Sequence, residues 1–177
     1  MEREELLRQN KVLDCLSHLP KRILSLHGRD NITEFVLHDL SHEQCFNLRK
    51  AAFFVNNPDF NCLKGVAGVA QRDIPQGLWN NIWEQKEMFS TYMRNAPFNR
   101  KVRGFAQCSL EKRQAPSSET IEVISRRLGI EKPSFYSLDM KHDNHGLLVF
   151  EKSNDQDYLD ERCFLNGVSL LGFCPVF

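Results

Sequence analysis

Histidine, cysteine and carboxylate side chains that could do chemistry gather between Asn31 and Asn57. His38 and His42 lie four residues apart, and Cys45 follows three residues later. Imidazole and thiolate groups at this spacing are ligands of zinc and similar borderline metals. Glu34, four residues before His38, adds a further ligand or a base. Because no glutamate stands between the two histidines as in the HExxH helix, the pattern does not predict a metalloprotease.

These side chains share a face only if one helix covers the whole stretch from Asn31 to Asn57. At 100° per residue, a polar line then runs along the helix between two apolar stripes. Its members are His38, His42, Cys45 and Arg49. Such a line is at least partly buried, and a buried polar group without a partner costs about 1–3 kcal/mol. We therefore expect these residues to pair with backbone, side chains, a metal or a ligand.

Two alternatives stay open for this segment. Ser41 and Gln44 have the spacing of a capping box, which would begin a new helix at His42 and separate the two histidines. Histidines on a helix are also commonly ordinary hydrogen-bonded core residues that hold no ligand. The polar line predicts a site only where other groups converge on it.

A second histidine pair, His142 and His145, flanks Asp143 and Asn144 in the stretch KHDNHG. Asp, Asn and Gly are the usual turn formers, so this stretch fits a hairpin turn without any function. The functional hypothesis is that the turn reaches the helical polar line, with Asp143 orienting a ligand histidine. A zinc ion or another divalent metal would then be held by His38, His42, His142 and His145. The full candidate site is His38, His42, Cys45, Arg49, Asp143 and His145.

Cysteine nucleophile chemistry is the other enzymatic hypothesis. Cys45 has His42 one turn before it, and Cys62 lies in a turn-rich segment. A nucleophilic cysteine needs a depressed pKa and a nearby base held by an orienting partner. A His–Cys pair on one helix arises easily by chance, so this pair alone does not predict an enzyme.

The composition is typical of a globular protein, and the cysteine content indicates the cellular compartment. The formal net charge is zero, so no global field favours nucleic acid or an anionic membrane. No apolar run approaches the roughly 18 residues of a membrane span, and the charged first residues do not resemble a secretory signal. The six cysteines are widely spaced without a CxxC pair. We therefore expect reduced thiols and a cytoplasmic location.

Helical patterns dominate the first part of the chain. Residues 2–19 predict an amphipathic helix that Pro20 stops, because proline lacks an amide donor and clashes with the preceding turn. Residues 77–94 predict another helix, and a third begins after Asn95-Ala96-Pro97. Between them, the small apolar residues 61–70 predict a tightly packed buried turn or strand.

The pattern changes after Ala115-Pro116-Ser117-Ser118, the clearest linker-like break. A helix capped by Ser117 or Ser118 runs to Leu128, and Gly129 suits a left-handed cap. Residues 134–151 predict a β-hairpin around KHDNHG, and residues 163–177 predict one or two more strands divided at Asn166-Gly167. The expected fold is one α+β domain over residues 1–177, with a sub-boundary near residues 114–118. It has a helix-rich N-terminal body and a small C-terminal antiparallel sheet.

Charge is unevenly distributed along the second half of the sequence. From Arg94 to Arg127 there are eight Lys or Arg and three Glu, and from Asp139 to Arg162 there are seven Asp or Glu and three Lys or Arg. Such blocks are usually solvated faces, and the first is the only candidate for a nucleic-acid contact. We expect a non-catalytic protein-interaction or regulatory module with another protein as partner. The alternative is a small metal-dependent or His/Cys enzyme built on the two histidine pairs.

Overall fold

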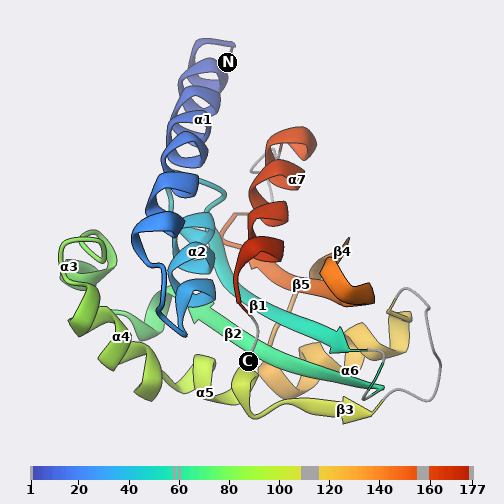
Figure 1. Ribbon diagram of the computed structural model, residues 1–177. Helices are drawn as coiled ribbons and strands as arrows, with labels where there is room; N and C mark the ends of the chain where they lie inside the picture. Colours follow the sequence, from blue (N-terminus) through green and yellow to red (C-terminus); the bar gives the residue numbers. More distant parts are fainter. Residues whose placement is uncertain (1, 58, 60, 109–115, 155–159, 176–177) are drawn as a thin grey trace.

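A computed structural model describes residues 2–57, 59, 61–108, 116–154 and 160–175 as an α+β fold (Figure 1). The expected α+β class with an antiparallel sheet is confirmed. The α-helices of the described residues are α1 (Glu2–Ser25), α2 (Ile32–Ser41), α3 (Gln76–Trp79), α4 (Lys86–Asn95), α5 (Pro97–Arg103), α6 (Ser118–Leu128) and α7 (Glu161–Ser169). The strands are β1 (Leu48–Asn57), β2 (Cys62–Ala70), β3 (Ala106–Cys108), β4 (Ser134–Asp139) and β5 (His145–Lys152). Short 3₁₀ helices are η1 (Gln71–Asp73), η2 (Lys141–Asp143) and η3 (Leu170–Phe173).

The five strands form one sheet in the order β3-β2-β1-β5-β4. Each pair of neighbours is antiparallel. The central strand β1 pairs with β2 on one side and with β5 on the other, so Ala51 lies between Val69 and Phe150. The sheet therefore brings together segments about 100 residues apart in the chain.

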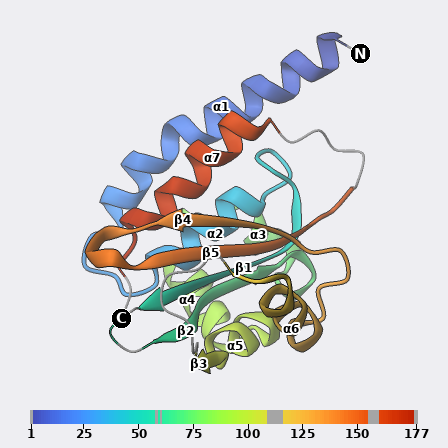
Figure 2. The same ribbon diagram turned by 90° about the vertical axis from the view of Figure 1, so that its right-hand side faces the viewer.

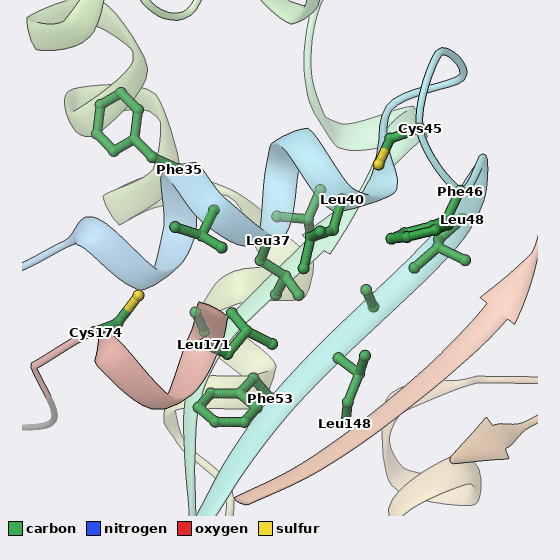
Figure 3. Close-up of a cluster of buried hydrophobic side chains, with 14 of the residues drawn as sticks. Phe35, Leu37, Leu40, Cys45, Phe46, Leu48, Phe53, Leu148, Leu171 and Cys174 are labelled. Atoms are coloured by element: carbon green, nitrogen blue, oxygen red, sulfur yellow. The ribbon is translucent and has the colours of Figure 1, made fainter. Parts of the chain in front are cut away.

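Helices cover both faces of the sheet (Figure 2). α1, α2 and α7 lie on one face, and α5 and α6 lie on the other. Because side chains alternate along a strand, β1 supplies two hydrophobic cores. Phe53 packs on the side of α2, and Phe54 packs on the side of α6. Figure 3 shows Phe53 and Leu148 projecting from the sheet toward Leu171.

The prediction of one helix from Asn31 to Asn57 is wrong. α2 ends at Ser41, His42 is extended, and Asn47 adopts a left-handed φ of 52° just before β1. The run AAFFV is apolar throughout because β1 is buried on both faces, which removes the alternation that identifies a half-buried strand. Leu48 and Phe53 are fully buried as expected, but on a strand.

Two further helix predictions need correction. α1 continues through Pro20 to Ser25. Pro20 is exposed, while Leu19 beside it is fully buried, so core packing outweighs the hydrogen bond that proline removes. The predicted helix over residues 77–94 is divided into α3 and α4.

The C-terminal segment is helical where the sequence predicted strands. Asp160 caps α7 by accepting a hydrogen bond from the Cys163 amide, and Asn166-Gly167 lies inside the helix instead of forming a turn. A Cβ at Gly167 would lie 2.8 Å from the Phe46 ring, so the glycine lets α7 approach the core closely. Tertiary packing thus overrides the turn preference of the Asn-Gly pair.

Several local predictions are confirmed. Ser117 caps α6 by accepting from the Thr120 amide, and Gly129 follows with a left-handed φ of 67°. β4 and β5 form the expected hairpin, and residues 62–70 form a largely buried strand. Of the predicted sub-boundary at residues 114–118, positions 114 and 115 lie outside the described part of the chain. In the described ranges, each helix is too short or too polar to cross a bilayer.

Candidate functional site

The predicted site begins with His38, which lies in the middle of a fully buried helix. All ten residues of α2 are buried, and His38 itself is 1% exposed. Its ring packs against Trp79, at a centroid distance of 4.3 Å, and against Phe89 at 5.4 Å. Nδ1 of His38 lies 3.2 Å from Oδ1 of Asp39. The imidazole therefore belongs to the core.

Asp39 connects three parts of the chain around this histidine. Nη1 of Arg22 in α1 donates to Oδ2 at 2.8 Å. The indole Nε1 of Trp83 lies 2.9 and 3.1 Å from the two carboxylate oxygens. The thiol of Cys15 donates weakly to the Asp39 carbonyl oxygen at 3.9 Å. These donors stabilise the negative charge of the buried Asp39 carboxylate.

Burial lowers the pKa of His38 below its ordinary value of 6.5, and the hydrogen bond and charge of Asp39 only partly oppose this effect. Nε2 of His38 is buried without a hydrogen bond of normal geometry to a described residue, and the backbone of Trp79 raises the pKa of His38 only slightly. The side chain is thus a neutral imidazole near neutral pH. It holds α2 against α3 instead of carrying charge.

His42 lies at the edge of the same region. Its ring stacks on Trp79, with centroids 5.7 Å apart and an interplanar angle of 13°. The Gln44 amide lies 3.2 Å from Nδ1, so Nδ1 accepts; Nε2 then carries the proton and donates to Oδ1 of Asn80 at 3.1 Å. The ring centroids of His38 and His42 are 5.9 Å apart, so the structure does bring these two histidines together.

A pocket of about 250 Å³ opens beside these histidines. Its lining includes Lys11, Asp14, Cys15, His18, Arg22, His38, Asp39, His42, Trp79 and Trp83. His38 and Asp39 are themselves buried. The side chains that a molecule in the pocket could contact are therefore mostly those of α1. The pocket is polar, but no nucleophile with an aligned base faces it among the described residues.

The cysteine hypotheses find no support in the geometry. Cys45 is 1% exposed, and its thiol lies beside that of Cys15. The hydrogen bond with Cys15 and burial both raise the pKa of Cys45, so the thiol stays protonated. Cys62 lies on β2, beside Cys108 of β3, and its thiol lies 3.9 Å from the carbonyl oxygen of Leu63.

Arg49 belongs to a different part of the molecule. It lies on β1, and its Nη1 pairs with Oε1 of Glu151 at 3.2 Å. Together with Lys50, Arg72 and Lys101, it lines a separate pocket of about 220 Å³. Arg49 therefore does not extend the line of His38 and His42.

The second histidine pair does not converge on the first. His142 and Asp143 are exposed in η2, and Nδ1 of His145 pairs with Oδ1 of Asp139 at 2.9 Å. His145 pairs with Asn56 at one end of β1, whereas His42 bonds the amide of Asn47 at the other end. A strand of this length separates them by roughly 30 Å.

The expected four-histidine zinc site is therefore not assembled. Within the described ranges, no three His, Cys, Asp or Glu side chains are grouped so that they could hold a metal ion. His145 has a carboxylate partner of its own, and His38 is directed into the core.

The basic residues between Arg94 and Arg127 are also dispersed. Arg94 and Arg103 line a cleft at the start of α2, and Lys101 lines the pocket near Arg49. Arg127 lies over the Phe105 ring, with its guanidinium carbon 5.4 Å from the ring centroid. Lys112 and Arg113 lie outside the described residues.

Glu34, which the sequence indicated only as an additional ligand or base, lies at the centre of a buried polar network. Asn99 donates to its Oε1 at 2.9 Å, Asn31 donates to its Oε2 at 3.2 Å, and Arg103 lies 3.6 Å away. Asn99 is fully buried, and it also accepts from the Gly68 amide and donates to the Met93 carbonyl. Burial raises the pKa of Glu34, while these hydrogen bonds lower it less. Only a single polar residue near the start of an apolar helix could have signalled this network in the sequence.

Comparison with known proteins adds no assignment, since no family model, no curated protein and no solved structure matches this chain.

Proposed function

We propose that this protein is a non-catalytic protein-interaction module that assembles through the outer face of α1. The supporting observation is a row of exposed leucines on a helix that extends beyond the rest of the molecule (Figures 1 and 2). Leu6 is 58% exposed, Leu13 is 53% exposed and Leu24 is 75% exposed. We take this row as the candidate interaction surface.

The exposed leucines lie on a different side of α1 from its core contacts. Val12 and Leu19 face the core and are buried. At 100° per residue, the exposed row lies about 120° away from them around the helix axis. We call this row the outer stripe; it consists of Leu6, Leu13, Pro20 and Leu24.

The spacing of the outer stripe indicates a helical partner. Leu6, Leu13 and Pro20 recur every seven residues, which is the repeat by which two helices pack along a seam. A sheet edge or a loop would not match this repeat over several turns. The occupant that the stripe fits is another amphipathic helix.

Charge favours the α1 helix of a second copy in antiparallel orientation. Residues 2–8 of α1 carry three Glu and two Arg, and the last turns carry Lys21 and Arg22, of which Arg22 is already paired with Asp39. Antiparallel pairing places acidic turns of one copy beside basic turns of the other, and it also opposes the two helix dipoles favourably. The arrangement is a two-fold symmetric contact in which Leu13 faces Leu13 of the second copy.

A cytoplasmic location remains part of this proposal. It is supported by the six cysteines, all of which are free thiols in the structure. A regulatory role is compatible with assembly through one helix. The enzymatic alternative has less support in the described residues, because the central His38–Asp39 pair is buried.

Sedimentation velocity over a range of protein concentrations tests the proposal. The wild-type chain should show a concentration-dependent dimer, and Leu13→Glu should be monomeric because it places two facing carboxylates at the centre of the seam. The matched control is Leu7→Glu, which changes a leucine of the same helix that is 55% exposed but lies off the stripe. It should leave the dimer intact. A wild-type monomer at all concentrations, or equal dissociation by Leu7→Glu, would overturn the proposal.

A further inference from the structure

A cleft of about 410 Å³ lies at the N-terminal end of α2 and is separate from the outer stripe. Its walls come from the residues before α2 and from β2, α4 and α5. The charged residues that line it are Arg29, Asp30, Glu34, Lys64, Glu87, Arg94 and Arg103. Clefts of this size accommodate small molecules of metabolite dimensions.

We propose that this cleft binds a small soluble molecule through a phosphate monoester group.

Four cations and three carboxylates line the cleft, and the carboxylates include Asp30 just before α2. The excess of one positive charge favours an anionic ligand. Arg29 forms an ion pair with Glu87, and Arg103 pairs with Glu34 at 3.6 Å. Lys64 forms no ion pair with another described residue. Arg94 acts only from a distance on Glu87. These two exposed cations therefore remain available to a ligand.

The first turn of α2 adds a second feature that favours an anion. The side chain of Asn31, at the N-cap position, makes no capping hydrogen bond, and its Nδ2 donates to Glu34 and to the hydroxyl of Ser90. A helix N-terminus without a side-chain cap has amide donors and a partial positive charge for an anion. The first turn of α2 and the cations Lys64 and Arg94 line the same cleft.

Thr33 is a buried polar residue in the wall of the cleft. Its Oγ1 has almost no accessible surface and interacts weakly with the Cys174 thiol. A ligand in the cleft therefore contacts the surface around Thr33 and not this hydroxyl.

The buried network behind the cleft places the Glu34 carboxylate beside Arg103. Glu34 is held by Asn99 and Asn31, and it in turn holds the Arg103 guanidinium. Because Glu34 is compensated by these donors, its charge does not repel a ligand as a free carboxylate would. Glu34 and Asn99 are thus positioning residues for the cleft.

The number and spread of donors favour phosphate over carboxylate. Lys64 on β2, Arg94 on α4, Arg103 on α5 and the start of α2 approach from separate elements. A carboxylate has two oxygens, whereas a phosphate monoester presents three terminal oxygens and up to two negative charges. Arginine and lysine with a helix N-terminus are a common set of phosphate ligands.

Isothermal titration of the full chain with glycerol 3-phosphate tests this inference. We expect saturable binding, and Lys64→Ala and Arg94→Ala should each raise the Kd about tenfold, because each removes one charge-assisted contact. Both residues are exposed, so neither substitution disturbs the core. The matched control is Arg100→Ala, an exposed cation of α5 outside the cleft, which should leave the Kd within a factor of about two.

Four outcomes would contradict the proposal. The first is an absence of saturable binding by both inorganic phosphate and glycerol 3-phosphate at millimolar concentration. The second is equal weakening by Arg100→Ala, which would indicate diffuse charge attraction instead of a site. The third is binding of succinate as tight as that of glycerol 3-phosphate. The fourth is sedimentation with phosphatidic acid vesicles in place of soluble binding. The last result would assign the cleft to a lipid headgroup.

Discussion

His38 is kept neutral by its surroundings in the folded chain. Its ring is enclosed by Trp79 and Phe89, and one ring nitrogen faces the carboxylate of Asp39. The carboxylate would favour the charged ring, but the loss of hydration outweighs this attraction. The histidine therefore behaves as an aromatic core residue with one polar contact.

This burial predicts a pH dependence of stability. The pKa of His38 is lowered from 6.5, so the unfolded chain binds this proton more readily than the folded chain. Its contribution to stability is present above pH 6.5 and is lost as the pH falls below that value. The free energy of unfolding should fall by up to about 1.4 kcal/mol per pH unit from this residue.

Urea unfolding at several pH values measures this effect. His38→Phe should flatten the pH profile below 6.5, since phenylalanine fills the aromatic site without titrating. His27→Gln, which changes an exposed histidine, is the control and should retain the wild-type profile. An unchanged slope in His38→Phe would show that other groups cause the acid sensitivity.

Contacts between elements depend on two glycines of β2. A Cβ at Gly65 would lie 1.8 Å from the Val102 carbonyl oxygen, and one at Gly68 would lie 2.4 Å from a Val102 methyl. These close approaches let α5 lie directly on β2. They also bring Arg103 to Glu34, so the same glycines shape the proposed phosphate cleft.

We expect Gly65→Ala to destabilise the protein by about 3 kcal/mol or more, because a backbone atom cannot move aside like a flexible side chain. Chemical denaturation followed by circular dichroism measures the change. Gly77→Ala is the matched control, since its Cβ would meet nothing within 4 Å, and it should change stability by less than about 1 kcal/mol. Near-identical stability of both variants would mean that α5 does not contact β2 as described.

At the scale of the whole molecule, β1 connects the two hydrophobic cores. Phe53 belongs to the core under α2, and Phe54 belongs to the core against α6. Neighbouring residues of one strand thus anchor both helical layers. This sharing predicts that the chain unfolds in a single cooperative transition, as one domain.

Tryptophan fluorescence can test this cooperativity. Both tryptophans, Trp79 and Trp83, pack on the first core. Phe54→Ala, in the second core, should still lower the stability reported by their fluorescence by about 3–5 kcal/mol. Phe53→Ala should lower it by a similar amount. If Phe54→Ala leaves the tryptophan transition unchanged, the two cores unfold independently and the single-domain prediction fails.

The sequence by itself determined those features that depend on neighbouring residues. Ser117 and Gly129 delimit α6 because a hydroxyl cap and a left-handed glycine act within one turn. The β4–β5 hairpin follows from turn formers between two extended runs. Burial of Phe53 follows from its place in a dense apolar run, whichever element contains it.

Only the tertiary structure decided the division of residues 31–57 and the positions of the candidate sites. β1 is buried on both faces, so its sequence lacks the alternation that distinguishes strand from helix. Asp39 finds Arg22 and Trp83 at sequence separations of 17 and 44 residues, and Glu34 finds Asn99 at 65. Such partners are chosen by the packing of whole elements, and no local spacing encodes them. The same packing places His42 and His145 at opposite ends of one strand.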